Sequence, residues 1–319
     1  MNITEKNNKI IIENIRDFNI SHIFDCGQCF RWDKEDDGSY TGVVKGKVIN
    51  VEQNESTVTF NNVTMEDYES LIKNYFDLDT DYSYIKERVN TDEIMDKAIQ
   101  FGEGIRILNQ DEWETMISFM ISANNRIPMI KKVIDNMSRC FGEYIGNYGG
   151  KDYYSFPTAE RLSQASVEEI LECKAGFRAP RLKEAATRFL KEQDVIYNLK
   201  NTNYDEGLSY LKTFSGIGDK VANCILLFSM KQFDTFPVDV WVRRVMQTLY
   251  VDKNTKDSDI KKFAENKFGE LSGYAQQYLF FYARENGIGK WLVKSQVRFK
   301  IDLRLFYLNS FSYNTKTKI

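Results

Sequence analysis

A lysine lies in the first turn of a predicted helix, where a neutral amine could act as a nucleophile. Lys220 follows Gly216 and Gly218, which flank one aliphatic residue and let the backbone turn sharply. The pattern over residues 204–230 predicts two helices joined by this turn, a helix–hairpin–helix. The free N–H groups and positive dipole end of the second helix favour a phosphate and disfavour the charged amine. We expect a clamp on the DNA backbone, with Lys220 as nucleophile or as one more phosphate contact.

An aspartate downstream favours the nucleophile. Asp239 follows Pro237 and precedes a predicted helix over residues 240–246, nineteen positions after Lys220. A short helix and a loop over residues 236–240 are enough chain to bring the carboxylate back toward the amine. As an N-cap, Asp239 would be held ionised and fixed in direction. Capping alone is the plain alternative, but the combination of Gly-x-Gly-x-Lys with Pro-x-Asp is rarer than either part.

Other catalytic chemistries have little support in the sequence. His22 is the single histidine, which makes histidine-based acid–base catalysis improbable. Cys26 and Cys29 form a C-x-x-C, but no second cysteine pair or histidine cluster completes a zinc site. A zinc or redox protein therefore remains only an alternative, and we expect neither a metal nor a cofactor.

The elements that must position these residues change type along the chain. Residues 22–62 contain short runs rich in Val, Ile, Thr and aromatic residues between turn signals, which predict β-strands. From about residue 65 the periodicity is helical, including a helix over residues 128–141. Capping boxes are predicted at Asp111 and Ser166. We expect an α+β protein with an antiparallel sheet domain over residues 1–100 and a helical domain over residues 101–319.

Composition and charge are compatible with a globular protein that binds DNA. The 319 residues are 42% hydrophobic and 28% charged, and no apolar run approaches a membrane span of about 20 residues. The net charge is −3, but residues 1–172 carry 18 Lys and Arg against 31 Asp and Glu. Residues 173–319 carry 25 against 15, which suggests one face for a polyanion. We expect a monomer without a signal peptide, cytoplasmic and nucleoid-associated if bacterial.

The stretch 204–246 resembles the helix–hairpin–helix, glycine/proline-rich loop, aspartate superfamily of DNA glycosylases. Its lysine implies the branch that is both glycosylase and lyase. Residues 271–319 contain no cysteine, which excludes the Fe–S cluster of the endonuclease III branch. Most of the chain is similar to the 8-oxoguanine DNA glycosylase/lyase family, in seven local matches in order: 26–32 (Cys-Gly-Gln-Cys-Phe-Arg-Trp), 75–79 (Tyr-Phe-Asp-Leu-Asp), 110–111, 122–125 (Ser-Ala-Asn-Asn), 176–180 (Gly-Phe-Arg-Ala-Pro), 274–276 and Phe280.

This resemblance implies a base-excision-repair enzyme that flips an 8-oxoguanine out of double-stranded DNA. Lys220 would displace the base and form a Schiff base, β-elimination would nick the strand, and Asp239 would stabilise the positive charge on the sugar. The implied base pocket has Phe280 and Cys224 on the two faces of the base and Gln276 at its Watson–Crick edge. The Gly27 carbonyl would accept from the N7–H that only the oxidised base carries.

The implied DNA contacts surround the pocket. Asn124 would fill the space left by the flipped base, Phe177 would wedge beside it, and Arg178 would contact the orphaned cytosine. Three positions depart from the eukaryotic pattern. Met129 stands where those members have Arg, Phe177 where they have Tyr, and Trp241 where a His often follows the aspartate. Because Met129 cannot donate a hydrogen bond, we expect relaxed discrimination of the opposite base.

Two further alternatives stay open on the sequence alone. A DNA-binding module without catalysis would need the hairpin but not Asp239, Gln276 or the Gly27 loop. A monofunctional glycosylase acting on alkylated purines usually lacks the lysine and uses the aspartate with water.

Overall fold

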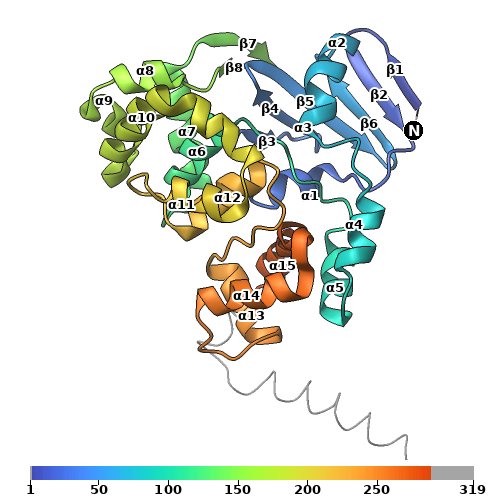
Figure 1. Ribbon diagram of the computed structural model, residues 1–319. Coiled ribbons are helices and arrows are strands. Elements are labelled where there is room, and N and C mark those ends of the chain that lie inside the picture. Colours follow the sequence, from blue (N-terminus) through green and yellow to red (C-terminus); the bar gives the residue numbers. More distant parts are fainter. Residues whose placement is uncertain (1, 289–319) are drawn as a thin grey trace, which may run out of the picture.

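The computed structural model describes residues 2–288, which form an antiparallel sheet followed by helices. This is the α+β class that the sequence predicts. In Figure 1 the sheet lies at the upper right and the helices of residues 112–229 at the upper left. The helices of residues 240–285 lie below, beside those of residues 82–101. The helical domain predicted over residues 101–319 extends past residue 288, and its last part lies outside the described residues.

The sheet has the spatial order β1-β2-β6-β5-β4-β3, with all neighbours antiparallel. Successive side chains of a strand face the core and the solvent in turn. Ile10 and Ile12 face the core, where they are fully buried and pair with Phe60 and Val58. The strands are β1 (Asn2–Glu5), β2 (Lys9–Glu13), β3 (Trp32–Lys34), β4 (Tyr40–Val44), β5 (Lys47–Asn54) and β6 (Thr57–Asn61).

The predicted element boundaries need three corrections. Two strands, β1 and β2, precede the expected start of the sheet at residue 22. Helix α1 (Ile20–Asp25) overlaps the stretch predicted as β, because Asn19 caps its first turn and Phe24 stacks on Trp32 at 4.2 Å. A hairpin of β7 (Tyr144–Tyr148) and β8 (Lys151–Tyr154) interrupts the region predicted as helical.

The first helices connect the sheet to the helical part of the chain. They are α2 (Met65–Asp67), a π-helical turn over Tyr68–Ile72, α3 (Lys73–Tyr75), α4 (Tyr82–Val89) and α5 (Glu93–Phe101). The larger helices then follow: α6 (Glu112–Ser122), α7 (Ile127–Phe141), α8 (Ala159–Gln164), α9 (Val167–Glu172), α10 (Ala179–Asn198), α11 (Tyr204–Leu211), α12 (Asp219–Ser229), α13 (Val240–Leu249), α14 (Asp257–Phe268) and α15 (Ser272–Glu285).

Helix ends follow the capping signals in part. Ser166 and Glu169 form the predicted capping box at the start of α9. At α6 only half of the box is made, because Asp111 accepts from the backbone of Glu114 at 2.9 Å while the Glu114 carboxylate pairs with Arg31 at 3.4 Å.

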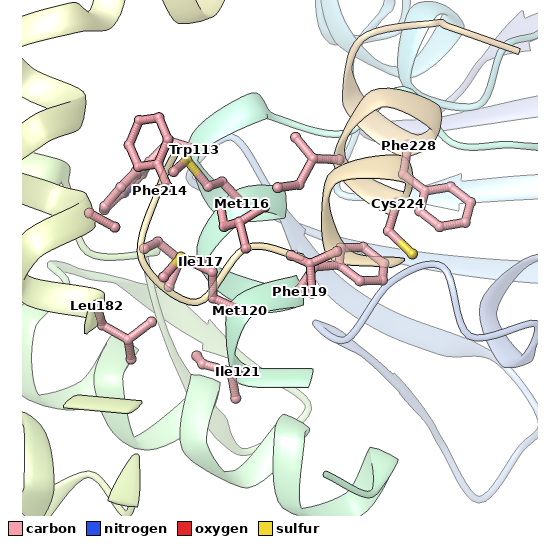
Figure 2. Close-up of a cluster of buried hydrophobic side chains, with 14 of the residues drawn as sticks. Trp113, Met116, Ile117, Phe119, Met120, Ile121, Leu182, Phe214, Cys224 and Phe228 are labelled. Atoms are coloured by element: carbon pink, nitrogen blue, oxygen red, sulfur yellow. The ribbon is translucent and has the colours of Figure 1, made fainter. Parts of the chain in front are cut away.

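Helix α6 lies at the centre of the helical part, packed against α12 and α10. Figure 2 shows the cluster of buried side chains around it. This packing holds the C-terminal end of α6 beside the first turn of α12. The labelled residues are Trp113, Met116, Ile117, Phe119, Met120 and Ile121 of α6, Leu182 of α10, Phe214, and Cys224 and Phe228 of α12.

The predicted domain boundary near residue 100 stays a proposal. Helix α5, on its N-terminal side, packs against α15 and shares a buried cluster with α13 and α14. Among residues 2–288, the helices are all too short or too polar to span a bilayer.

Candidate active site

A cleft of about 1050 Å³ opens between several separate parts of the chain. These are the α6–α7 loop, the Gly216–Gly218 turn, the start of α13 and the end of α15, and a fifth part, Gly27 and Phe30 of the N-terminal region, also lines the cleft. Lys220 and Asp239 both line it, so the fold brings together the two residues that the spacing predicts to act together.

Lys220 is held by the C-terminal end of α6. Its Nζ donates to the Ser122 Oγ at 3.1 Å and lies 4.9 Å from the centre of the Phe119 ring. Cys224 lies one helical turn further along α12, and Figure 2 places its sulfur beside Phe119. Burial raises the pKa of the Cys224 thiol to about 11, against an opposing effect of Lys220.

Asp239 is the N-cap of α13, as predicted. One carboxylate oxygen accepts from the backbone N–H groups of Trp241 and Val242, each at 2.8 Å. The carboxylate is thus fixed in direction. Burial nevertheless outweighs these bonds and the nearby Lys220 amine, and the pKa of Asp239 is raised above its ordinary value. The expectation that capping would keep the group firmly ionised needs this correction.

The predicted helix–hairpin–helix is present as α11, a turn and α12. Ile217 is buried between the two exposed glycines and anchors the turn to the core. Gly216 has a φ of +89°, where a side chain would be strained. Gly218 is the N-cap of α12, and open space surrounds the position of a Cβ there. The backbone of Gly218 and the first turn of α12 are therefore accessible to a phosphate.

A second, smaller cavity of about 50 Å³ adjoins the cleft. All four residues predicted for the base pocket line it, together with Lys220 and Asp239: Gly27, Cys224, Gln276 and Phe280. The side-chain oxygen of Gln276 is buried and has no hydrogen-bond partner within residues 2–288. An unpaired buried acceptor is costly, which makes this amide a candidate to bind a donor group of a ligand.

The Gly27 loop is shaped by its neighbours. Gly27 has a φ of +80°, and a Cβ at this position would lie 3.0 Å from the Phe280 ring, so only glycine fits. Gln28 is fully buried, and its amide donates to the Arg106 carbonyl at 2.7 Å and accepts from the Leu108 backbone at 2.8 Å. The conspicuous glutamine of this motif therefore fixes the loop, while Gly27 faces the cavity.

Two predicted DNA contacts lie between α6 and the first turn of α7, Asn124 in the loop and Met129 in α7 itself. Asn124 is exposed with a φ of +52°, and the Met129 side chain is 44% exposed, and both line the cleft. Phe177 and Arg178 lie beside this loop. Phe177 is 63% exposed, whereas Arg178 is buried and donates to the carbonyls of Ala123 and Asn124. In this conformation Arg178 supports the loop, and contact with a cytosine would require it to exchange these bonds.

Trp241 lines the cleft at the first turn of α13, and the Arg244 guanidinium lies 5.1 Å from its ring centre. An aromatic side chain therefore borders the cleft next to the Asp239 cap.

The two cysteines of the C-x-x-C are free thiols in the described part of the chain. Cys26 and Cys29 are both buried, and burial raises the pKa of both thiols, that of Cys26 to about 12. Over residues 2–288, His, Cys, Asp and Glu side chains form no group of three or more that could hold a metal ion.

Three side chains of the site were not singled out from the sequence: Ser122, Phe119 and Arg284. Ser122 lies within the stretch that resembles the family's insertion loop, but a serine at a helix end carries no signal of its own. The Arg284 guanidinium lies 5.3 Å from the Phe280 ring centre and donates to the Asp25 carbonyl, near the Gly27 loop.

Two family models match the chain. The 8-oxoguanine DNA glycosylase N-terminal domain matches residues 10–116, and the HhH-GPD superfamily base excision DNA repair protein matches residues 117–270.

Individual proteins agree with these models. A probable N-glycosylase/DNA lyase of Methanothermobacter thermautotrophicus is 30% identical over 233 residues, 67% of this chain and 72% of the relative. The N-glycosylase/DNA lyase of Saccharomyces cerevisiae is 29% identical over 308 residues, 82% of both chains. A crystal structure of Clostridium acetobutylicum 8-oxoguanine glycosylase/lyase, with DNA containing cytosine opposite 8-oxoG, is 45% identical with a TM-score of 0.88. The match covers 90% of this chain and 99% of that one.

Proposed function

The chain belongs to the 8-oxoguanine DNA glycosylase family of the HhH-GPD superfamily and is a bifunctional DNA glycosylase/lyase, and we propose that it excises 8-oxoguanine from double-stranded DNA through Lys220. This membership excludes the two alternatives left open by the sequence, a DNA-binding module without catalysis and a monofunctional glycosylase. The names of the relatives support the substrate class, and the site supports the residues.

One observation carries the assignment of residues. Lys220 and Asp239 line the same small cavity as Gln276, whose amide oxygen is buried and has no partner in the described part of the chain. A nucleophile, a carboxylate and an unsatisfied acceptor for a base edge thus converge in a space bordered by the aromatic ring of Phe280.

The proposed reaction starts at the sugar of the flipped nucleotide. The Lys220 amine bonds to C1′, and the C1′–N9 bond breaks with its electron pair leaving on the base, which takes up a proton. The amine loses a proton, the sugar ring opens, and a protonated Schiff base joins enzyme and DNA. Removal of a C2′ proton then breaks the C3′–oxygen bond and nicks the strand on the 3′ side.

Asp239 would assist this sequence through its charge and its proton affinity. Its ionised carboxylate would stabilise the positive charge that develops on the sugar. Burial has raised its pKa, so the carboxylate would also accept a proton more readily than an exposed aspartate does.

Base recognition would use the walls of the small cavity. The Phe280 ring and the Cys224 side would enclose the two faces of the base, and Gln276 would bind its Watson–Crick edge. The Gly27 carbonyl would accept from the N7–H of 8-oxoguanine, which guanine lacks. A mismatched acceptor pair at this point discriminates against guanine because it leaves polar groups unpaired.

The DNA around the lesion would be held by the hairpin and the α6–α7 loop. The exposed backbone at Gly216 and Gly218 would bind phosphate, and Trp241 would lie near the phosphates on the other side of the cleft. Asn124 would occupy the space of the flipped base, with Phe177 beside it. Arg178 would support this loop and reach the cytosine only by giving up its bonds to the loop.

The decisive experiment measures covalent trapping. Incubation with a duplex containing 8-oxoguanine opposite cytosine in the presence of borohydride should give a reduced, covalent protein–DNA adduct, and Lys220→Gln should give none. Absence of an adduct with the unaltered protein, or equal trapping by the variant, would refute Lys220 as the nucleophile.

Opposite-base choice is tested with the same duplexes carrying each of the four bases opposite the lesion. Because Met129 offers no hydrogen-bond donor at the edge of the cleft, we expect excision opposite adenine within about tenfold of that opposite cytosine, since one lost polar contact is worth about 1.4 kcal/mol or less. A much stronger preference for cytosine would contradict this.

The wider setting remains a prediction. A monomer in the cytoplasm, associated with the nucleoid if the source is a bacterium, fits a DNA-repair enzyme that needs neither metal nor cofactor for the proposed chemistry.

A further inference from the structure

Ser122 is the last residue of α6, and its hydroxyl makes two hydrogen bonds. The Oγ donates to the Phe119 carbonyl at 2.7 Å and lies 3.1 Å from the Nζ of Lys220. A hydroxyl has one proton and two lone pairs. Because the proton is used on the Phe119 carbonyl, the oxygen presents only lone pairs to Lys220 and must accept from the amine.

This acceptor fixes the direction of the amine. A lysine ammonium or amine otherwise rotates freely about its terminal bond. With one N–H directed at Ser122, the remaining positions on Nζ point away from α6, toward the cavity that Lys220 shares with Asp239. The Phe119 ring, 4.9 Å from Nζ, closes the α6 side. Attack requires a lone pair directed at the reacting carbon, so a fixed rotation favours reaction.

The same residue begins the loop that carries Asn124. Ala123 and Asn124 follow Ser122 directly, and the Arg178 guanidinium donates to the carbonyls of both. A displacement of this loop therefore acts on the Ser122 hydroxyl within two residues, and through it on the Lys220 amine.

We propose that Ser122 is a positioning residue that orients the nucleophilic amine and links it to the Asn124 loop. This inference rests on the proposed role of Lys220. It assigns the serine no contact with the base, and its effect should fall on the rate of Schiff-base formation rather than on DNA binding.

The test compares Ser122→Val with Ser122→Thr, two variants of nearly the same shape that differ in the hydroxyl. The probe is a duplex with an abasic site, which removes base excision from the measurement. At saturating enzyme, Ser122→Val should trap the adduct about five- to tenfold more slowly than the unaltered protein, the usual effect of one lost hydrogen bond. Ser122→Thr should restore most of the rate, and DNA affinity by fluorescence anisotropy should stay within about twofold for both.

Ser138→Ala serves as the matched control, because Ser138 is a buried serine of the neighbouring helix α7 and lies outside the cleft. Its trapping rate should equal that of the unaltered protein. Equal rates for Ser122→Val and Ser122→Thr would overturn the proposal, as would parallel losses of rate, affinity and melting temperature in Ser122→Val. Trapping by Lys220→Gln would instead refute the proposed function, whatever the serine variants do.

Discussion

Asp239 serves two roles whose physical requirements conflict. As the N-cap of α13 it is stabilised by two backbone donors, but as a wall of the cavity it is removed from water. The raised pKa records that desolvation outweighs the favourable contacts. In the native fold the ionised form of this carboxylate is therefore less stable than that of an exposed aspartate, a property that catalytic sites often have.

We predict that Asp239→Asn stabilises the protein increasingly as pH rises. In the folded protein Asp239 binds its proton more tightly than in the unfolded chain, so its contribution to stability is complete below about pH 4 and is lost as pH rises through the folded pKa. Asparagine does not titrate and can still cap α13 through its side-chain oxygen. Thermal unfolding of both proteins should show their difference in Tm growing from about pH 4 to pH 7.

Asp239→Asn should also lose excision activity. A variant that gains stability while it loses activity is folded, so the loss of activity would not come from unfolding. A Tm difference that stays constant over this pH range, or that reverses, would contradict the prediction.

At the residue scale, the sequence predicted that Lys220 and Asp239 lie close together, and both line the same cavity. A lysine after Gly-x-Gly and an aspartate after Pro-x can each be recognised from a few adjacent residues. Ser122 and Arg178 were not assigned their observed roles, because those roles depend on hydrogen bonds across 98 and 55 residues of chain, respectively. No local pattern encodes such partners.

The two glycines of the hairpin turn have different roles. Gly216 provides a backbone conformation with positive φ, whereas Gly218 has an ordinary extended φ of −99° and open space around it. One glycine is required by the fold of the turn, and the other leaves room for a ligand.

We predict that alanine separates these two roles. Gly216→Ala should lower the free energy of unfolding by about 1 kcal/mol or more, because alanine tolerates positive φ poorly. Gly218→Ala should change it by less than about 0.5 kcal/mol, since lost chain entropy offsets the weaker cap. Denaturant unfolding measures both.

Anisotropy with undamaged duplex DNA supplies the second readout. Gly218→Ala should weaken binding because its methyl group occupies space next to the exposed N–H groups of α12. Unchanged affinity in Gly218→Ala would show that phosphate does not approach this glycine.

At the element scale, the sequence predicted what local signals specify. The helix pair around the turn, the capping box at α9 and the cap at Asp239 each follow from a few adjacent residues. The β7–β8 hairpin was missed although Gly149 and Gly150 mark its turn with positive φ, because its strands are short and only partly buried. Helix α1 was missed because its β-rich composition reflects packing on the sheet.

At the scale of the whole molecule, the boundary between the two family models does not coincide with a boundary between structural elements. The two family models meet between residues 116 and 117, which falls inside α6 (Glu112–Ser122). The cleft likewise draws on Gly27 from the N-terminal part and on Lys220 and Phe280 from the helical part. No single linear segment contains all the residues that line the cleft.

Charge is also a property of the whole chain. The net charge of −3 hides the excess of Lys and Arg over residues 173–319. We predict that affinity for undamaged duplex DNA falls at least about tenfold between about 50 and 200 mM salt, because bound phosphates release counterions. A titration by anisotropy at several salt concentrations checks this, and an affinity independent of salt would contradict binding through phosphates.

The small cavity has a consequence for how quickly such an enzyme can survey a genome. Its volume of about 50 Å³ is a third of the roughly 150 Å³ in a protein cavity that holds one benzene ring, and a purine has two fused rings. Entry of a base therefore requires the walls to move, and the half-buried Phe280 ring is the most exposed of the three base-pocket side chains, since Cys224 and Gln276 are buried. A genome offers about 10⁶–10⁹ undamaged sites for each specific one. Each base that enters the cavity would need the same movement, so a slow opening of this wall would limit how many bases are inspected each second.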